Sequence, residues 1–190
     1  MIKRLSLMLM IVLTLCLTAC GYSDVDLNKD IELSEELYDL EFALDGAKLS
    51  VPLDIEELED LGWRLVDNPD SVSDEQMIIQ GIRVVNNEYK GCEAFIRTSN
   101  TGSNQIANIM ITNISNGVLA KEYPDLTISK GIKFGSSLED VEEAFGIAND
   151  ELEISGVHTL TYSNEKATVI IGIHDEYGLT SIGLMDESLT

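Results

Sequence analysis

The chain has 190 residues, with 34 acidic and 12 basic side chains and a formal net charge of −22. This balance excludes nucleic-acid binding, because phosphates are held by clusters of Lys and Arg and the sequence contains none. The charge favours a soluble domain that anionic lipid headgroups repel, so attachment to a membrane requires a separate anchor.

The first 20 residues have the organisation of a bacterial secretory signal peptide. A basic start precedes an apolar run over residues 5–17, and Leu17-Thr18-Ala19-Cys20 follows. The run is too short for a transmembrane helix, which needs about 20 residues. Its end resembles the lipobox of bacterial lipoproteins, in which the cysteine is acylated and the chain is cut before it. We expect residues 1–19 to be removed and Cys20 to anchor the protein on the extracytoplasmic face of the cell membrane; cleavage after Ala19 without lipidation is the alternative.

Residues 20–41 are polar and acidic and are predicted to form a tether behind the lipid. Within them, one set of side chains matches positions 1, 3, 5, 7 and 12 of a calcium-binding loop. The set consists of Asp24, Asp26, Asn28, Asp30 and Glu35. Lys29 stands where the sharp turn of such a loop needs Gly, and the chain before Asp24 is too short for the incoming helix. A calcium-responsive domain using residues 24–35 therefore stays an alternative to a plain acidic tether.

Residues 42–118 are predicted to form a first unit, in which a short strand over 42–49 leads into a helix. Asp54 caps this helix, apolar residues recur along one face, and Gly62 ends it. Strand-like stretches follow at 81–85, 92–97 and 106–114.

Residues 119–190 repeat this order about 85 positions later, with a boundary expected near 115–128. A short strand at 131–135 precedes a helix over 138–145. This helix begins with a capping box of Ser136 and Glu139 and ends at Gly146. Alternating apolar residues then indicate strands around 158–162, 168–173 and 181–185. Each helix has a thin apolar stripe that needs a sheet to cover it. The predicted fold is therefore α+β, with two tandem units that each pack a short helix on an antiparallel sheet of three or four strands.

The stretch from Gly131 to Gly146, with Tyr162 and the hairpin ending at Leu184, resembles the repeat of beta-lactamase inhibitory protein and of small outer-membrane assembly lipoproteins. It is also similar to lipoproteins of Firmicutes. The resemblance covers most of residues 42–190 and is strongest over 128–184. It implies a fold of tandem helix-and-sheet units that bind other proteins and lack catalytic chemistry.

The search for chemistry favours a protein that is not an enzyme and uses no cofactor or metal. Cys92 lies in a strand-like run beside acidic neighbours, which is typical of a buried structural thiol. His158 and His174 are expected to lie out of register in their hairpin, with His158 opposite Ile171, and so to be poorly placed for sharing a metal. No hydrolase, metalloprotease or phosphate-loop motif occurs. A cell-wall hydrolase is the least favoured alternative.

Strand alternation also predicts a binding face in the second unit. Leu160, Tyr162, Val169, Ile171 and Ile182 share one parity and should lie under the helix over 138–145. The opposite parity is poor in charge and carries scattered apolar groups, as interface cores do. Its members are Thr159, Thr161, Thr168, Ile170, Ser181 and Met185. Two alternatives are that the two units pack these faces together and that the face is only solvated.

These observations predict a lipid-anchored cell-surface binding module, either inhibitor-like or otherwise protein-binding. Its expected partner is an unidentified protein or envelope component, and its contact with the membrane is through the acyl chains of Cys20.

Overall fold

The computed structural model describes residues 31–66, 81–99 and 105–189. The fold is mostly β, with 49% of the described residues in strands and 14% in helices, and its largest element is one nine-stranded sheet. The predicted α+β fold of two tandem helix-and-sheet units is therefore wrong.

The nine-stranded sheet is antiparallel throughout and has the strand order β11-β12-β13-β14-β7-β6-β5-β4, with β3 paired to β7. Its strands are β3 (Leu53–Asp54), β4 (Trp63–Leu65), β5 (Ile82–Asn86), β6 (Glu93–Thr98), β7 (Gln105–Thr112), β11 (Asp150–Ile154), β12 (Val157–Ser163), β13 (Ala167–His174) and β14 (Gly178–Asp186). The two predicted halves of the chain meet inside this sheet, because β7 of the first half pairs with β14 of the second. This pairing satisfies backbone groups that two separate sheets would leave as open edges. The limits at residues 118 and 119 are not tested by it and stay a prediction.

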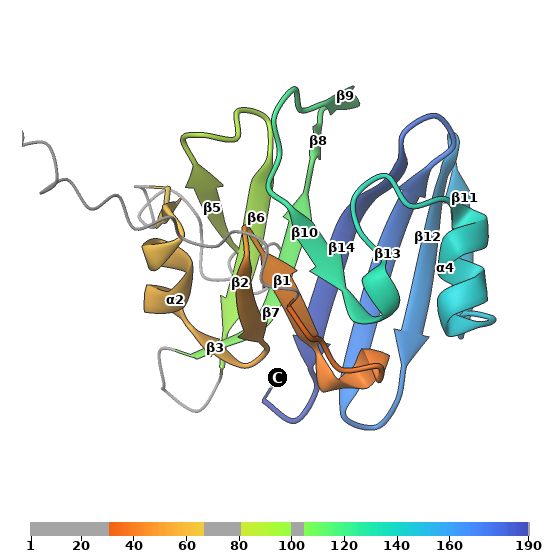
Figure 1. Cartoon of the computed structure of the whole chain (residues 1–190), viewed down its shortest axis with the longest axis horizontal. Helices are drawn as coiled ribbons and strands as arrows, with labels where there is room; N and C mark the ends of the chain where they lie inside the picture. The colour runs from red at the N-terminus through yellow and green to blue at the C-terminus, as the bar shows by residue number, and fades with distance from the viewer. Residues whose placement is uncertain (1–30, 67–80, 100–104, 190) are drawn as a thin grey trace, which may run out of the picture. The chain divides into compact units, whose positions relative to one another are not determined.

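A smaller sheet of order β10-β1-β2 also combines the two halves (Figure 1). It consists of β1 (Glu41–Leu44), β2 (Ala47–Ser50) and β10 (Leu126–Ile128). The stretch predicted as one strand over 42–49 is thus a hairpin, which turns at Asp45-Gly46 with φ of 50° and 81°. A third, two-stranded sheet pairs β8 (Ile114–Ser115) with β9 (Val118–Leu119).

The two α-helices of the described residues lie close to the predicted positions. Helix α2 spans Ile55–Asp60 behind a capping box of Asp54 and Glu57. Helix α4 spans Leu138–Phe145, and its capping box is formed by Ser137 and Asp140, one residue later than predicted. Short 3₁₀ helices occur at Leu37–Asp39 (η2) and Ser129–Gly131 (η4). No helix of the described residues has both the length and the apolar character needed to cross a membrane.

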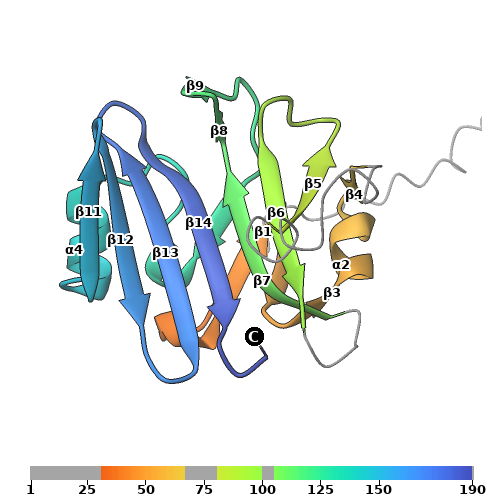
Figure 2. The ribbon, with the colours of Figure 1, turned by 180° about the vertical axis from the view of Figure 1, so that it is seen from behind.

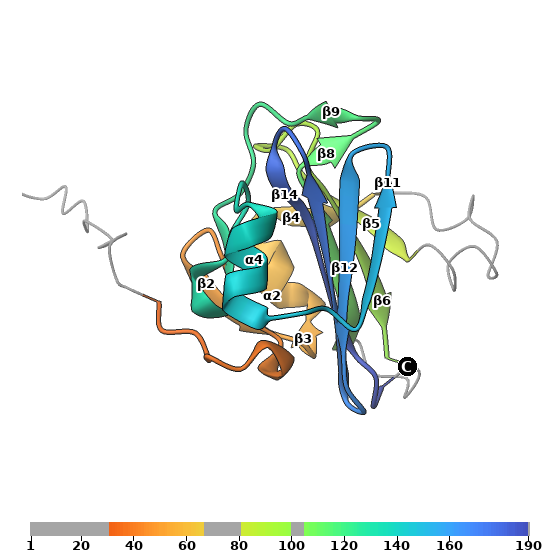
Figure 3. The ribbon, with the colours of Figure 1, turned by 90° about the vertical axis from the view of Figure 1, so that its right-hand side faces the viewer.

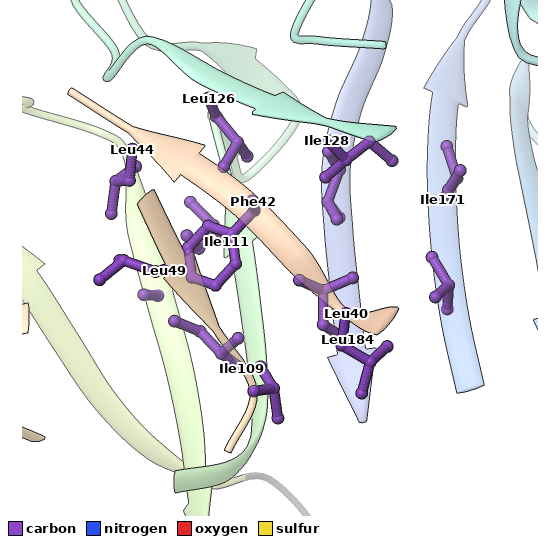
Figure 4. Packing of buried hydrophobic residues seen from close by; sticks show 14 of the residues in the cluster. Leu40, Phe42, Leu44, Leu49, Ile109, Ile111, Leu126, Ile128, Ile171 and Leu184 are labelled. Carbon is purple, nitrogen blue, oxygen red and sulfur yellow. The ribbon is translucent and has the colours of Figure 1, made fainter. Parts of the chain in front are cut away.

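The hydrophobic core lies between the small sheet with its neighbouring helices and one face of the nine-stranded sheet. Figure 3 shows α2, α4 and β2 on the same side of that sheet. Phe42 of β1 is fully buried, and its ring points toward Ile109 and Ile111 of β7 (Figure 4). Burying a side chain of this size contributes about 1.5–3 kcal/mol relative to leaving it exposed. The small sheet therefore covers the middle of the large one, a role that the sequence prediction gave to helices alone.

Candidate functional site

The face of the nine-stranded sheet that points away from the core is called the open face here. No helix or strand of the described residues covers it (Figure 2). The structure places all six residues of the predicted binding face on this side, each partly exposed, namely Thr159, Thr161, Thr168, Ile170, Ser181 and Met185. Their neighbours of opposite parity, among them Val169 and Ile171, are fully buried. Whether the six bind a partner stays a prediction.

The open face continues beyond the predicted residues into strands of the first half. Directly opposite residues across paired strands lie about 5 Å apart, so their side chains form rows across the sheet. One row runs through Thr161, Ile170, Gly183, Met110 and Phe95. The next row runs through Thr168, Met185, Asn108 and Arg97. Because the prediction treated the halves as separate units, it missed the residues of β6 and β7.

The two rows enclose a groove of about 180 Å³, called the open-face groove here. Gly183 forms its floor, since this residue places no side chain between Ile170 and Met110. The lining residues are Gly81, Phe95, Ile96, Arg97, Asn108, Met110, Thr168, Ile170, Gly183 and Met185. Met110 is 38% exposed although it lies in the middle of the sheet, beside the partly exposed Ile170 and Met185. The sequence signal that could have found the groove is the glycine in β14, facing apolar residues on both neighbouring strands.

Hydrogen bonds and an ion pair hold polar side chains at the margins of the open face. Thr168 Oγ1 donates to Glu187 Oε1 at 2.6 Å, beside Met185. Arg83 of β5 forms an ion pair with Glu93 of β6. Leu152 of the edge strand β11 lies opposite Thr159 and is 55% exposed. The groove is thus apolar with polar side chains beside it, as in protein interfaces, and exposed apolar surface recurs at the β11 edge.

His158 lies on the face of the sheet opposite the groove, and His174 lies at the end of β13. The register of their hairpin differs from the prediction. His158 lies opposite Ile173 rather than Ile171, because the hairpin turn is longer than expected. Its Nδ1 lies 3.2 Å from Glu151 Oε1 and its Nε2 lies 3.2 Å from Asp175 Oδ1. The hydrogen bond to Glu151, aided by the charges of Glu153 and Asp175, raises the pKa of His158.

These contacts favour the protonated form of His158 and argue against a role as a catalytic base. A general base must present a free ring nitrogen to a substrate, and both nitrogens of His158 face carboxylates. His174 stacks on Tyr177 with ring centroids 4.5 Å apart. Among residues 31–66, 81–99 and 105–189, no group of three or more His, Cys, Asp and Glu side chains is arranged to hold a metal ion.

Cys92 is buried, with 2% of its surface exposed. Burial, with the nearby charge of Asp45, raises the pKa of its thiol to about 12. The thiolate is the reactive form of cysteine, so this residue is a core side chain and not a nucleophile.

Several predicted features lie outside the described residues. The signal peptide over 1–19, the lipidated Cys20 and the calcium-loop positions 24–30 belong to this group. Of the predicted tether, residues 31–41 are described, and Leu37 and Leu40 in this stretch are buried in the core.

Comparisons with protein-family models, with curated proteins and with solved structures find no match for this chain.

Proposed function

We propose that the protein is a lipid-anchored, extracytoplasmic binding module without catalytic activity, and that its open face contacts another macromolecule. The observation that carries this proposal is the open-face groove, where partly exposed Met110, Ile170 and Met185 surround a glycine floor. A folded domain gains nothing from leaving such groups in water, and well-packed interfaces are centred on apolar groups of this kind.

Site-specific photocrosslinking in the intact cell envelope tests the proposal. The full chain would carry p-benzoylphenylalanine in place of Met110 in the groove, or in place of exposed Glu139 on α4 as the matched control. We expect irradiation to give a discrete adduct from position 110 and none from position 139. Equal adducts from both positions, or none from position 110, would overturn the proposal.

The anchor is proposed from the lipobox-like end of the signal peptide and is tested separately. In Cys20→Ala the thiol that would be acylated is absent, so the protein should leave the membrane fraction. Membrane and soluble fractions are compared by immunoblot after a high-salt wash, with Cys92→Ala as the control that keeps Cys20. A Cys20→Ala protein that stays in the washed membranes would contradict lipid anchoring.

A further inference from the structure

The arginines of this chain are concentrated on the open face. The sequence contains four, of which Arg4 lies in the predicted signal peptide. The other three lie on the consecutive strands β4, β5 and β6, as Arg64, Arg83 and Arg97. Arg64 lies opposite Val85, and Arg83 lies opposite Phe95, so strand alternation puts all three on the side of the groove. A chain with 34 acidic side chains thus has its remaining guanidinium groups on the face that holds the groove, with Arg97 in the groove lining.

Two of these arginines have no carboxylate partner within the described part of the chain. Arg83 is paired with Glu93, whereas Arg64 and Arg97 form no ion pair with a described residue. The Nε atom of Arg97 is buried and has no hydrogen-bond partner there. A buried donor without an acceptor costs about 1–3 kcal/mol. An acceptor supplied by another molecule would remove this cost.

Arg97 is also the one charged side chain among the described residues that line the groove. Its neighbours there include Phe95, Met110 and Met185, so an incoming group meets apolar surface and a guanidinium together. Guanidinium groups bind carboxylates through two parallel hydrogen bonds, and the interaction is stronger where water is partly excluded. The groove therefore matches an apolar side chain with a carboxylate close to it.

We infer that the open-face groove binds an acidic segment of a partner protein. An apolar side chain of that segment fills the space above Gly183, and a neighbouring Asp or Glu pairs with Arg97, while Arg64 attracts further carboxylates. This inference rests on the proposed function, because it names the chemistry of the partner that the open face contacts.

The net charge of −22 does not prevent this pairing. Repulsion between exposed charges is screened beyond about 8 Å at physiological ionic strength, whereas a pair in a partly buried groove is screened much less. A phosphate polymer would gain the arginines without filling the apolar groove. A second copy of this chain would bring its whole acidic surface near the first. The observations therefore favour a protein segment over these two occupants.

Selection from random dodecapeptides tests the inference. The full chain in neutral-lipid nanodiscs is the target, and each enriched peptide is compared with an analogue in which Asn and Gln replace Asp and Glu. Fluorescence anisotropy then measures binding to the wild type, Arg97→Gln, Arg97→Lys and Met110→Asp. Lys121→Gln, a change of an exposed lysine outside the strands of the sheet, is the matched control.

The expected result is enrichment of peptides that combine Asp or Glu with bulky apolar residues. Binding should weaken at least 10-fold for the amide analogue and for Arg97→Gln, less for Arg97→Lys, and not at all for Lys121→Gln. Urea unfolding of each variant shows whether it keeps the fold. If Arg97→Gln does not fold, Arg97→Lys, which keeps the charge, is used in its place to test the contribution of the guanidinium group.

Other outcomes would overturn the inference in distinguishable ways. Enriched peptides without acidic residues, lost in Met110→Asp but not in Arg97→Gln, would refute the acidic segment and leave the proposed function standing. If polyphosphate binds in the groove and no apolar peptide does, the occupant is a phosphate polymer. If the wild type forms a dimer that Met110→Asp abolishes, the occupant is a second copy of the chain. If every enriched peptide binds all groove variants as tightly as the wild type, both the proposed binding function of the open face and the acidic-segment inference are contradicted.

Discussion

The protonation of His158 is tied to three neighbouring carboxylates. Glu151 and Glu153 approach it from β11, and Asp175 approaches from the turn between β13 and β14. These groups raise its folded-state pKa above the ordinary value of about 6.5. Folding therefore favours the charged form of this imidazole. The imidazole, which belongs to β12, links the edge strand β11 to the turn between β13 and β14.

This linkage predicts a pH-dependent contribution to stability. A raised folded-state pKa makes the contribution complete below about pH 6.5, and it is lost as the pH rises through the folded-state value. Urea unfolding of the wild type and of His158→Gln at pH 5.5 and pH 8.5 measures it. The wild type should exceed the variant by a larger margin at pH 5.5. An equal margin at both pH values, or a larger one at pH 8.5, would contradict the role given to the three carboxylates.

At the scale of elements, the hairpins of this fold depend on two-residue turns with positive φ. Asp45-Gly46, Asn116-Gly117 and Ser155-Gly156 all have φ between 50° and 81° at both positions. This conformation matches the twist of the paired strands, and Gly adopts it without steric cost. The three dipeptides are legible in the sequence, and Asp45-Gly46 could have shown that residues 42–49 are a hairpin rather than one strand.

Gly178 is constrained by close packing as well as by its positive φ, because it lies at the start of β14, against the turn before α4. A Cβ atom there would lie 2.4 Å from the carbonyl oxygen of Gly135. Backbone hydrogen bonds from Gly135 to Leu179 and from Leu179 to Ser136 hold these two segments together. The turn therefore cannot move away without losing bonds that fix α4 to the sheet.

We expect Gly178→Ala to be much more destabilising than Gly117→Ala. Both glycines have positive φ, of 68° and 75°, so both substitutions cost about 1–2 kcal/mol in backbone strain. Only Gly178 has atoms within 4 Å of the added methyl group, and overpacking of this kind adds about 1–3 kcal/mol. The free energies of unfolding in urea give the comparison. Equal losses would show that the turn before α4 yields without cost.

At the scale of the whole molecule, the sequence was informative about elements and uninformative about their assembly. The apolar alternation of β12, β13 and β14 and the stripe of α4 were legible, because burial acts on each element separately. The pairing of β7 with β14 and of β1 with β10 joins residues far apart in the chain. Such pairings depend on which free strand edges meet, and the periodicity of apolar residues within one strand does not specify its partner. The part of the open-face groove built from Phe95, Arg97 and Met110 escaped prediction for the same reason.

The joined sheets predict that the folded unit loses its structure in one step. Phe42 lies in β1, directly opposite Leu49 of β2 and Ile128 of β10, and it packs on the strands where the two halves meet (Figure 4). Phe42→Ala should cost about 3–5 kcal/mol, because it removes a fully buried ring and leaves a cavity that the sheets cannot close.

Two probes in different halves measure whether this loss is shared. Fluorescence of Trp63, the single tryptophan, reports on the first half, and amide hydrogen exchange of β12 and β13 reports on the second. Because β7 and β14 are paired, both probes should show the same decrease in the free energy of unfolding for Phe42→Ala. Val118→Ala, at a side chain that is 68% exposed, should change neither probe. A decrease at Trp63 alone would mean that the two halves unfold independently despite their common sheet.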